Sequence, residues 1–266
     1  MAKGGYIGVG STAHKLKGGY VGVGGTAYEF NKGYVGVGGT AYEFSFADTE
    51  ALLDELFSGM TRIEYASTNA NSDAISIPAV ANSYYIAGGP INPAAGNDTT
   101  HYGFFCISYY DGTSMIPIWS IWPEGGTGYA YIELNGSSVS PVHFYGTSST
   151  ETEETGMQIA RVTFPLDPKE LVSHLSVFST DGSMSDGNTD ADSFRVGTSG
   201  RTNPSYYIAS VSGYVGVGKL KDGVFTQLYN STGFYYDSAN NRVYYSTNGT
   251  SSSKGRGMIA GFNYTP

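Results

Sequence analysis

The chain has 266 residues, a formal net charge of −9 and one cysteine. A chain of this length buries a sizeable core without help from metals or disulfides, and one cysteine excludes a disulfide within it. Lys and Arg form no block, so the basic surface that direct nucleic-acid binding needs is missing.

The composition is rich in aromatic residues and poor in charge. The chain has 23 Tyr and 13 Phe, and 14% of its residues are charged, against about 25% in an average protein. This profile is typical of a tyrosine-rich β protein. The first ten residues hold no continuous apolar stretch and no segment reaches about 18 apolar residues, so we expect neither a secretory signal peptide nor a membrane span.

The chain begins with a tandem repeat of 14 residues. The sequence GYVGVGGTAYEF occupies residues 19–30 and again residues 33–44, and a looser copy, GYIGVGSTAHKL, occupies residues 5–16. Valine alternates with tyrosine and glycine, and a Gly-Gly pair precedes a second alternating stretch, which together predict two short strands and a turn. We therefore expect residues 1–45 to form glycine-rich β-hairpins.

Such a hairpin is marginal alone, so we expect the three units to stack on each other or on a neighbour. The hexapeptide GYVGVG returns at residues 213–218, and we expect that strand to lie alongside the repeats, in the same chain or the next one. No Lys-Ser/Thr and no helix follow the glycines, so a phosphate loop is not indicated. The residues expected to make the assembly contacts are Tyr6, Tyr20, Val21, Val23, Tyr34, Val35, Val37 and Tyr214.

Residues 46–60 predict one short helix. Asp48 or Thr49 can cap its start, and Gly59 stops it. Its apolar stripe consists of Leu52, Leu53, Leu56 and Phe57. Such a stripe packs against the β domain of its own chain or docks on a partner.

Residues 61–266 predict an antiparallel β-sandwich or jelly-roll-like domain. A dozen or so short strands alternate with clusters of Gly, Asn, Ser and Asp. A local hairpin is predicted around Asn240 and Asn241, which suit left-handed turn positions. A single helical turn is expected after Pro168, and residues 146–156 predict an exposed acidic loop.

The sequence nominates no catalytic residue, cofactor or metal. The four His lie in separate segments without zinc-site spacing, and Cys106 lies in an apolar run that predicts a buried core residue. An alternation that could face a calcium ion comprises Asp186, Asn188, Asp190 and Asp192. This calcium site is the weaker alternative to an Asp-rich surface loop, because Ala191 and Gly197 stand where an EF-hand needs Gly and Glu.

Trp119 and Trp122 are three residues apart. They cannot both point to one side of a regular strand, so one faces outward unless Pro117 or Pro123 marks a bulge. An exposed Trp on a β-sandwich is suited to gripping sugar rings. Trp119 and Trp122 are therefore the residues expected to bind a glycan, although most Tyr and Trp here should belong to the core or an interface.

The repeated GYVGVGGTAYEF resembles the short tandem YVGVGGVA or YIGVNGVAR phrases of virion proteins from tailed phages and prophages of Gram-positive bacteria. The resemblance covers roughly residues 1–45 and the echo at residues 213–218. It implies a structural, tail or fibre component that is made in the host cytoplasm, needs no signal peptide and is located in the virion. It also implies other virion proteins and further copies of this chain as partners.

Two functions are consistent with these features. The first is a non-enzymatic virion protein for decoration, fibre, collar or tail, with residues 1–45 as the anchor, residues 46–60 as a helix and residues 61–266 projecting outward, for example to a host surface. The second is a lectin-like carbohydrate-binding module that recognises host glycans. A glycan hydrolase would need two carboxylates about 5 to 10 Å apart, and the sequence nominates no such pair.

Overall fold

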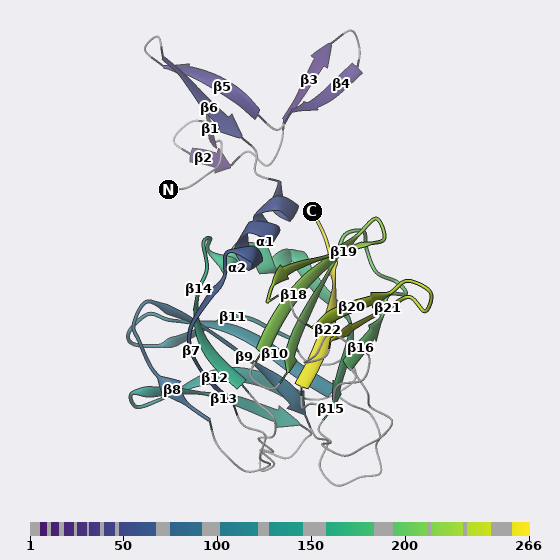
Figure 1. Cartoon of the computed structure of the whole chain (residues 1–266). Helices are drawn as coiled ribbons and strands as arrows, with labels where there is room; N and C mark the ends of the chain where they lie inside the picture. Colours follow the sequence, from purple (N-terminus) through teal and green to yellow (C-terminus); the bar gives the residue numbers. More distant parts are fainter. Residues whose placement is uncertain are drawn as a thin grey trace. The chain divides into compact units, whose positions relative to one another are not determined.

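The structure is a computed structural model in which the chain forms two compact units, Met1–Asp54 and Glu55–Pro266 (Figure 1). The residues it describes are 6–9, 12–15, 19–23, 26–30, 32–37, 40–45, 48–67, 75–91, 102–121, 128–145, 158–183, 194–211, 214–230, 233–245 and 257–266.

In the first unit six strands pair two by two in antiparallel fashion. The pairs are β1 (Tyr6–Val9) with β2 (Thr12–Lys15), β3 (Gly19–Val23) with β4 (Thr26–Phe30), and β5 (Lys32–Val37) with β6 (Thr40–Ser45). The stacking of the three units stays a prediction. The side chains expected to make it lie outside the described part of the structure: Tyr6, Tyr20, Val21, Val23, Tyr34, Val35 and Val37.

The predicted helix is α1 (Thr49–Ser58). Asp48 caps it, because its Oδ1 accepts a hydrogen bond of 3.0 Å from the backbone N–H of Glu50. At the other end the N–H of Gly59 donates to the carbonyl of Glu55 at 3.0 Å. Of the predicted stripe, Leu53, Leu56 and Phe57 are buried and Leu52 is half-buried.

The second unit is built of antiparallel sheets, as predicted. Its first eight strands are β7 (Thr61–Ser67), β8 (Ile77–Pro78), β9 (Ser83–Ile91), β10 (Tyr102–Tyr110), β11 (Met115–Ile121), β12 (Gly128–Asn135), β13 (Ser138–Tyr145) and β14 (Gln158–Thr163). Its last eight are β15 (Leu175–Ser183), β16 (Phe194–Gly197), β17 (Ser205–Val211), β18 (Tyr214–Lys221), β19 (Val224–Tyr229), β20 (Phe234–Asp237), β21 (Arg242–Tyr245) and β22 (Gly257–Tyr264).

A second, shorter helix separates these two sets of strands. It is α2 (Pro168–Leu171), followed by the 3₁₀ turn Val172–His174. Its position agrees with the helical turn expected after Pro168. The Oδ1 of Asp167 accepts from the N–H of Lys169 at 3.0 Å, so an Asp caps this helix as another caps α1.

The two sets of eight strands are two copies of one topology. The first set forms a five-stranded sheet of order β11-β10-β9-β14-β7 and a three-stranded sheet β12-β13-β8. The second set forms the sheets β19-β18-β17-β22-β15 and β20-β21-β16, which is the same order with every strand number raised by eight. In Figure 1 the first copy runs from blue to teal and the second from green to yellow.

Irregularities in the strand pairing recur at matching places. A bulge interrupts β10–β11 beside the pair Ile107 and Trp119, and another interrupts β18–β19 beside the pair Val217 and Tyr229. A second bulge interrupts β14–β7 and recurs in β22–β15. Because bulges re-aim strands at defined points, their recurrence supports an internal duplication rather than a chance likeness of sheet order.

The sequence carries a trace of this duplication. The five residues SYYIA occupy both 83–87 and 205–209, at the start of β9 and β17. The dipeptide Ile-Ala at 159–160 likewise recurs at 259–260, in β14 and β22. Residues 61–266, which the sequence predicts as one sandwich, are therefore arranged as two related sheet pairs.

Each copy encloses its own hydrophobic core between its five-stranded and three-stranded sheets. The cores match position by position: Tyr85 and Ala87 in the first correspond to Tyr207 and Ala209 in the second. The remaining matched pairs are Ile77 with Val196, Ile132 with Phe234, Val139 with Val243, and Ile159 with Ile259. Cys106 is a buried free cysteine of the first core, as predicted, and burial raises the pKa of its thiol to about 12.

The two five-stranded sheets also face each other, which creates a third apolar layer that we call the central layer. Strands β9 and β10 lie against β15 and β22. A Cβ placed on Gly88 would lie 2.9 Å from the Oγ of Ser210. Gly88 and Ser210 hold equivalent positions after SYYIA, and contact between equivalent positions is expected when two copies face each other about an approximate twofold axis.

Residues 214–218 of the echo lie in strand β18, whose neighbours in its sheet are β17 and β19. The expected pairing of this strand with the repeats is thus replaced by pairing within the second copy. The side chain of Tyr214 lies outside the described residues, so its assembly role stays a prediction. In the predicted hairpin, β20 and β21, Asn241 has a left-handed φ of 51°, whereas Asn240 donates its N–H to the Oδ1 of Asp237 at 3.1 Å.

Aromatic rings pack closely against two glycines of the echo, Gly216 and Gly218. A Cβ on Gly216 would lie 2.6 Å from Cε2 of Tyr245 and 2.9 Å from Cε2 of Phe234. A Cβ on Gly218 would overlap Cζ of Phe225. A bare backbone is therefore needed at both positions for the rings to approach the strand this closely.

We expect Gly216→Ala to lower the free energy of unfolding by about 1–3 kcal/mol, because the added methyl overpacks a buried ring cluster. The measurement is urea unfolding followed by circular dichroism. Gly197→Ala is the matched control, since a Cβ there meets nothing within 4 Å and should cost little. Equal stability of the two variants would contradict the close approach of the rings.

A candidate binding pocket in the central layer

A pocket opens between the two five-stranded sheets, in the part of the central layer that β7, β9, β18 and β19 border. Its apolar floor is formed by Ile86 and Val215, both of which are buried. Side chains alternate along a strand, and Tyr85, Ala87 and Gly216 face the cores of the two copies. Ile86 and Val215 consequently face the central layer, which is how two residues from different copies meet in one cavity.

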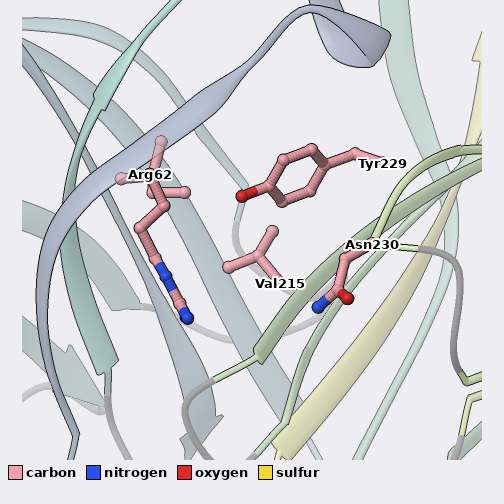
Figure 2. A pocket seen from close by; sticks show the side chains of 5 residues that line it. Arg62, Val215, Tyr229 and Asn230 are labelled. Carbon is pink, nitrogen blue, oxygen red and sulfur yellow. The ribbon is translucent and has the colours of Figure 1, made fainter.

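The remaining lining residues are polar. They are Arg62 on β7, Tyr229 at the end of β19, and Asn230 directly after it. Figure 2 shows the hydroxyl of Tyr229 and the amide of Asn230 pointing toward the side of the pocket where Arg62 lies. Asn230 has a left-handed φ of 48°, which turns the chain after the strand and brings its side chain to the rim.

Arg62 also stacks on a neighbouring ring. Its Cζ lies 4.0 Å from the centroid of the Tyr65 ring. This cation–π contact helps to orient the guanidinium. The pocket therefore combines an apolar floor, one cationic group, one phenol hydroxyl and one carboxamide.

The equivalent place in the other half of the central layer is filled. Trp119 corresponds to Tyr229, because each follows the matching bulge and pairs with the matching residue of the adjacent strand. By the same registers, Phe105 corresponds to Val215, and Val177 corresponds to Arg62. The Trp119 ring lies 5.0 Å from that of Phe262 and 6.2 Å from that of Phe105, centroid to centroid.

The pocket thus arises where two copies of one fold differ in side-chain size. Large rings fill the space in one half, whereas valine, tyrosine and arginine line it in the other. Tighter contacts of β15 with β9 and β10 accompany the filled half. The cavity follows from the sequence difference between the copies, and its cationic group has no counterpart in the filled half, where Val177 stands at the position of Arg62.

The residues expected to bind a glycan have different positions in the structure. Trp119 is half-buried, and its indole packs the two sheets together. A bulge lies between Pro117 and Trp119, before the segment that joins the two tryptophans, so the expectation that one of them faces outward stays a prediction. Trp122 lies outside the described residues, as do Asp186, Asn188, Asp190 and Asp192 of the alternative calcium site.

Sequence reasoning missed Arg62, Tyr229 and Asn230. No motif contains them, and they come from strands far apart in the chain. The repeated SYYIA indicates the duplication, but Tyr229 lies closer to its SYYIA than Trp119 does to its own, so the match of these two residues needs the strand registers of the structure. The described residues contain no group of three or more His, Cys, Asp or Glu placed to hold a metal ion.

A search of protein-family models, curated proteins and solved structures finds no match for this chain. In the part of the chain that the structure describes, no helix combines the length and the apolar character required to cross a membrane.

A tyrosine at the edge of the central layer has a strongly shifted pKa. Burial and, to a smaller extent, the nearby carboxylate of Asp167 together raise the pKa of Tyr84 to about 12. The hydroxyl of Tyr84 donates to the Oδ1 of Asp167 at 3.5 Å, and its ring lies 5.5 Å from that of Phe164. In the second copy Tyr206 and Tyr264 make the equivalent ring contact at 6.2 Å.

We expect the free energy of unfolding to fall as the pH rises above about 10. An unfolded tyrosine ionises near that pH, whereas folded Tyr84 keeps its proton until about pH 12, so its stabilising contribution is complete below pH 10 and is lost between these values. Burial also raises the pKa of Tyr85 and Tyr207.

Tyr84→Phe should make the loss of stability between pH 9 and pH 11 smaller, measured by urea unfolding at each pH. Tyr235→Phe is the control, because that side chain is exposed, and its profile should match the unsubstituted protein. An unchanged slope in Tyr84→Phe would show that Tyr84 does not contribute to this pH dependence.

Proposed function

We propose that the protein is a non-enzymatic structural component of a phage virion. Residues 1–45 anchor it to other virion proteins or to further copies of itself. The duplicated β unit then projects from the particle, where it serves attachment to the host surface. Decoration, fibre, collar and tail-associated positions in the virion all fit this arrangement.

One observation supports the assembly role of the repeats. The hexapeptide GYVGVG occurs at residues 19–24, 33–38 and 213–218. In β18 its glycines lie under the rings of Phe225, Phe234 and Tyr245. A glycine-valine strand of this sequence therefore provides a flat, apolar surface that fits an aromatic ring from a neighbouring strand.

Each exact repeat contains both halves of such a contact. GYVGVG provides the bare glycines, and TAYEF provides a tyrosine and a phenylalanine. A unit that contains both the aromatic rings and the glycine-valine strand on which such rings pack is self-complementary. Self-complementary surfaces suit the symmetric arrays of a virion. The three tandem units multiply the contact and so raise its strength without new chemistry.

The β unit fits the role of a rigid projecting body. Two cores and a central layer bury aromatic and aliphatic side chains in three separate planes. Burial in several layers gives a stiff module, because close-packed interiors transmit strain instead of yielding to it.

We expect deletion of residues 1–45 to abolish incorporation of the protein into phage particles, because the anchoring contacts are lost. The measurement is mass spectrometry of purified particles from infections in which the variant is the only source of the protein. The copy number per particle of the full chain serves as the reference.

Gly197→Ala, which alters an exposed position of the β unit, is the control and should be incorporated like the full chain. A thermal melt of the deletion variant shows whether the β unit stays folded. Normal incorporation of the deletion variant would overturn the proposed role of the repeats.

A further inference from the structure

We propose that the central-layer pocket binds a single neutral aromatic ring that carries a hydroxyl group, as phenol or the side chain of a tyrosine does. The proposal concerns the β unit and goes beyond the attachment role proposed above. It uses none of the repeat residues and assigns Arg62 no bond to the ligand. Ligand binding and particle incorporation can therefore fail independently of each other.

The internal duplication shows which groups are missing from the pocket. Phe105 in the filled half corresponds to Val215 in the open half. By the pairing of β22 with β17 and of β14 with β9, Phe262 corresponds to Val162. At both positions a phenylalanine of one half is thus a valine in the other. The loss of two phenyl rings accounts for the open space, which suits a ring in their place.

A ring in that space would find an aromatic neighbour, as the rings of the filled half do. There the Trp119 ring lies 5.0 Å from that of Phe262, centroid to centroid, at an interplanar angle of 49°. Tyr229 holds the position of Trp119 and presents its own ring to the pocket. Tilted aromatic pairs are favoured beyond the area that they bury. An aromatic ring is therefore preferred to a saturated ring of the same size.

The lining of the pocket has an apolar part and a polar part. Ile86 and Val215 form the buried apolar floor, which suits the unsubstituted edge of the ring. Tyr229 and Asn230 bring a hydroxyl and a carboxamide to the same cavity (Figure 2). Both groups can donate and accept hydrogen bonds, so they suit one hydroxyl on the ring. Arg62 forms a wall of the cavity, and the ligand needs no charge to match it.

The size of the cavity limits the ligand to one ring. Its volume is about 220 Å³. A cavity of about 150 Å³ holds benzene, so the pocket has room for one six-membered ring with a small substituent. In the other half of the central layer, Trp119 and Phe105 fill the equivalent space beside Phe262. The chain should therefore bind one ligand, not two.

The test is a titration of the full-length chain with phenol, followed by methyl NMR and by isothermal titration calorimetry. We expect one site and a Kd on the order of 1 mM, as ligand efficiencies give for a molecule of this size. The ring current of bound phenol should shift the methyl signals of Ile86 and Val215. Absence of saturable binding, or binding that leaves these methyl signals unmoved, would overturn the proposal.

Cyclohexanol is the matched control ligand. It has the size and the hydroxyl of phenol, but its ring is saturated. It should bind at least about threefold more weakly, because it cannot form the aromatic contact with Tyr229. Cyclohexanol binding as tightly as phenol would overturn the assignment to an aromatic ring.

Two variants restore the rings of the filled half. Val215→Phe copies Phe105 and places a ring in the cavity, so it should weaken phenol binding by at least about tenfold. Val162→Phe copies Phe262 and should have the same effect. Val224→Phe is the control, because it makes the same change at a position of β19 that is 65% exposed. This control should bind phenol like the unsubstituted protein.

Thermal melts of these variants guard against loss of folding. Val215→Phe enters an existing cavity, so its melt should match or exceed that of the unsubstituted protein. If Val215→Phe unfolds, Val162→Phe serves in its place. A folded variant of either position that binds phenol as tightly as the unsubstituted protein would overturn the proposal.

A comparison of phenol with N-acetyltyrosinamide separates two sources of the same ring. The second compound carries the phenol group on a peptide backbone, as a tyrosine of a neighbouring chain does. If it binds at least as tightly as phenol, the result supports a tyrosine side chain as the occupant. If phenol binds and N-acetyltyrosinamide binds at least about tenfold more weakly, the result supports a free small molecule.

Discussion

The packing of the two five-stranded sheets against each other is the contact on which the β unit depends. Each of these sheets is covered on both faces, by its own three-stranded sheet and by the five-stranded sheet of the other copy. Consecutive residues such as Tyr85, Ile86 and Ala87 are therefore all buried. Tyr206 to Ala209 repeat this burial in the second copy, so neither sheet presents a broad polar face.

The two copies share a backbone frame but fill the central layer differently. Matching bulges place Trp119 and Tyr229 at equivalent positions of the backbone. The difference in packing between the two halves therefore comes from the residue types and not from the backbone. In one half a tryptophan packs on Phe262 and closes the layer. In the other half a smaller valine and a charged Arg62 leave a cavity with a polar rim. Equivalent positions of the two copies therefore differ in what they do, since one closes the central layer and the other lines a cavity.

Local features of the fold could be predicted from the sequence, whereas the layering could not. The helix with its cap at Asp48, the turn after Pro168 and the buried Cys106 depend on neighbours in the chain. The division into two sheet pairs depends on which face of each strand is covered. A strand buried on both faces loses the alternation that would reveal its faces, so SYYIA indicates a strand without indicating its partners. The pocket residues were hidden for the same reason, since Arg62 and Tyr229 meet only through that layering.

The glycine-valine hexapeptide connects this unit to the repeats. In β18 the valines Val215 and Val217 are buried on the central-layer face, and Gly216 between them and Gly218 after them receive rings on the other face. Both faces of this short strand are thus packed. The valine side chains fill one face, and the glycines leave room for aromatic rings on the other. A strand of this kind is stabilised by packing on both faces. Without neighbours its apolar surface stays in contact with water, so the strand is not stable in isolation. Three tandem copies of such a strand at the start of the chain therefore favour a neighbour that covers them, which is the physical basis for their proposed role in assembly.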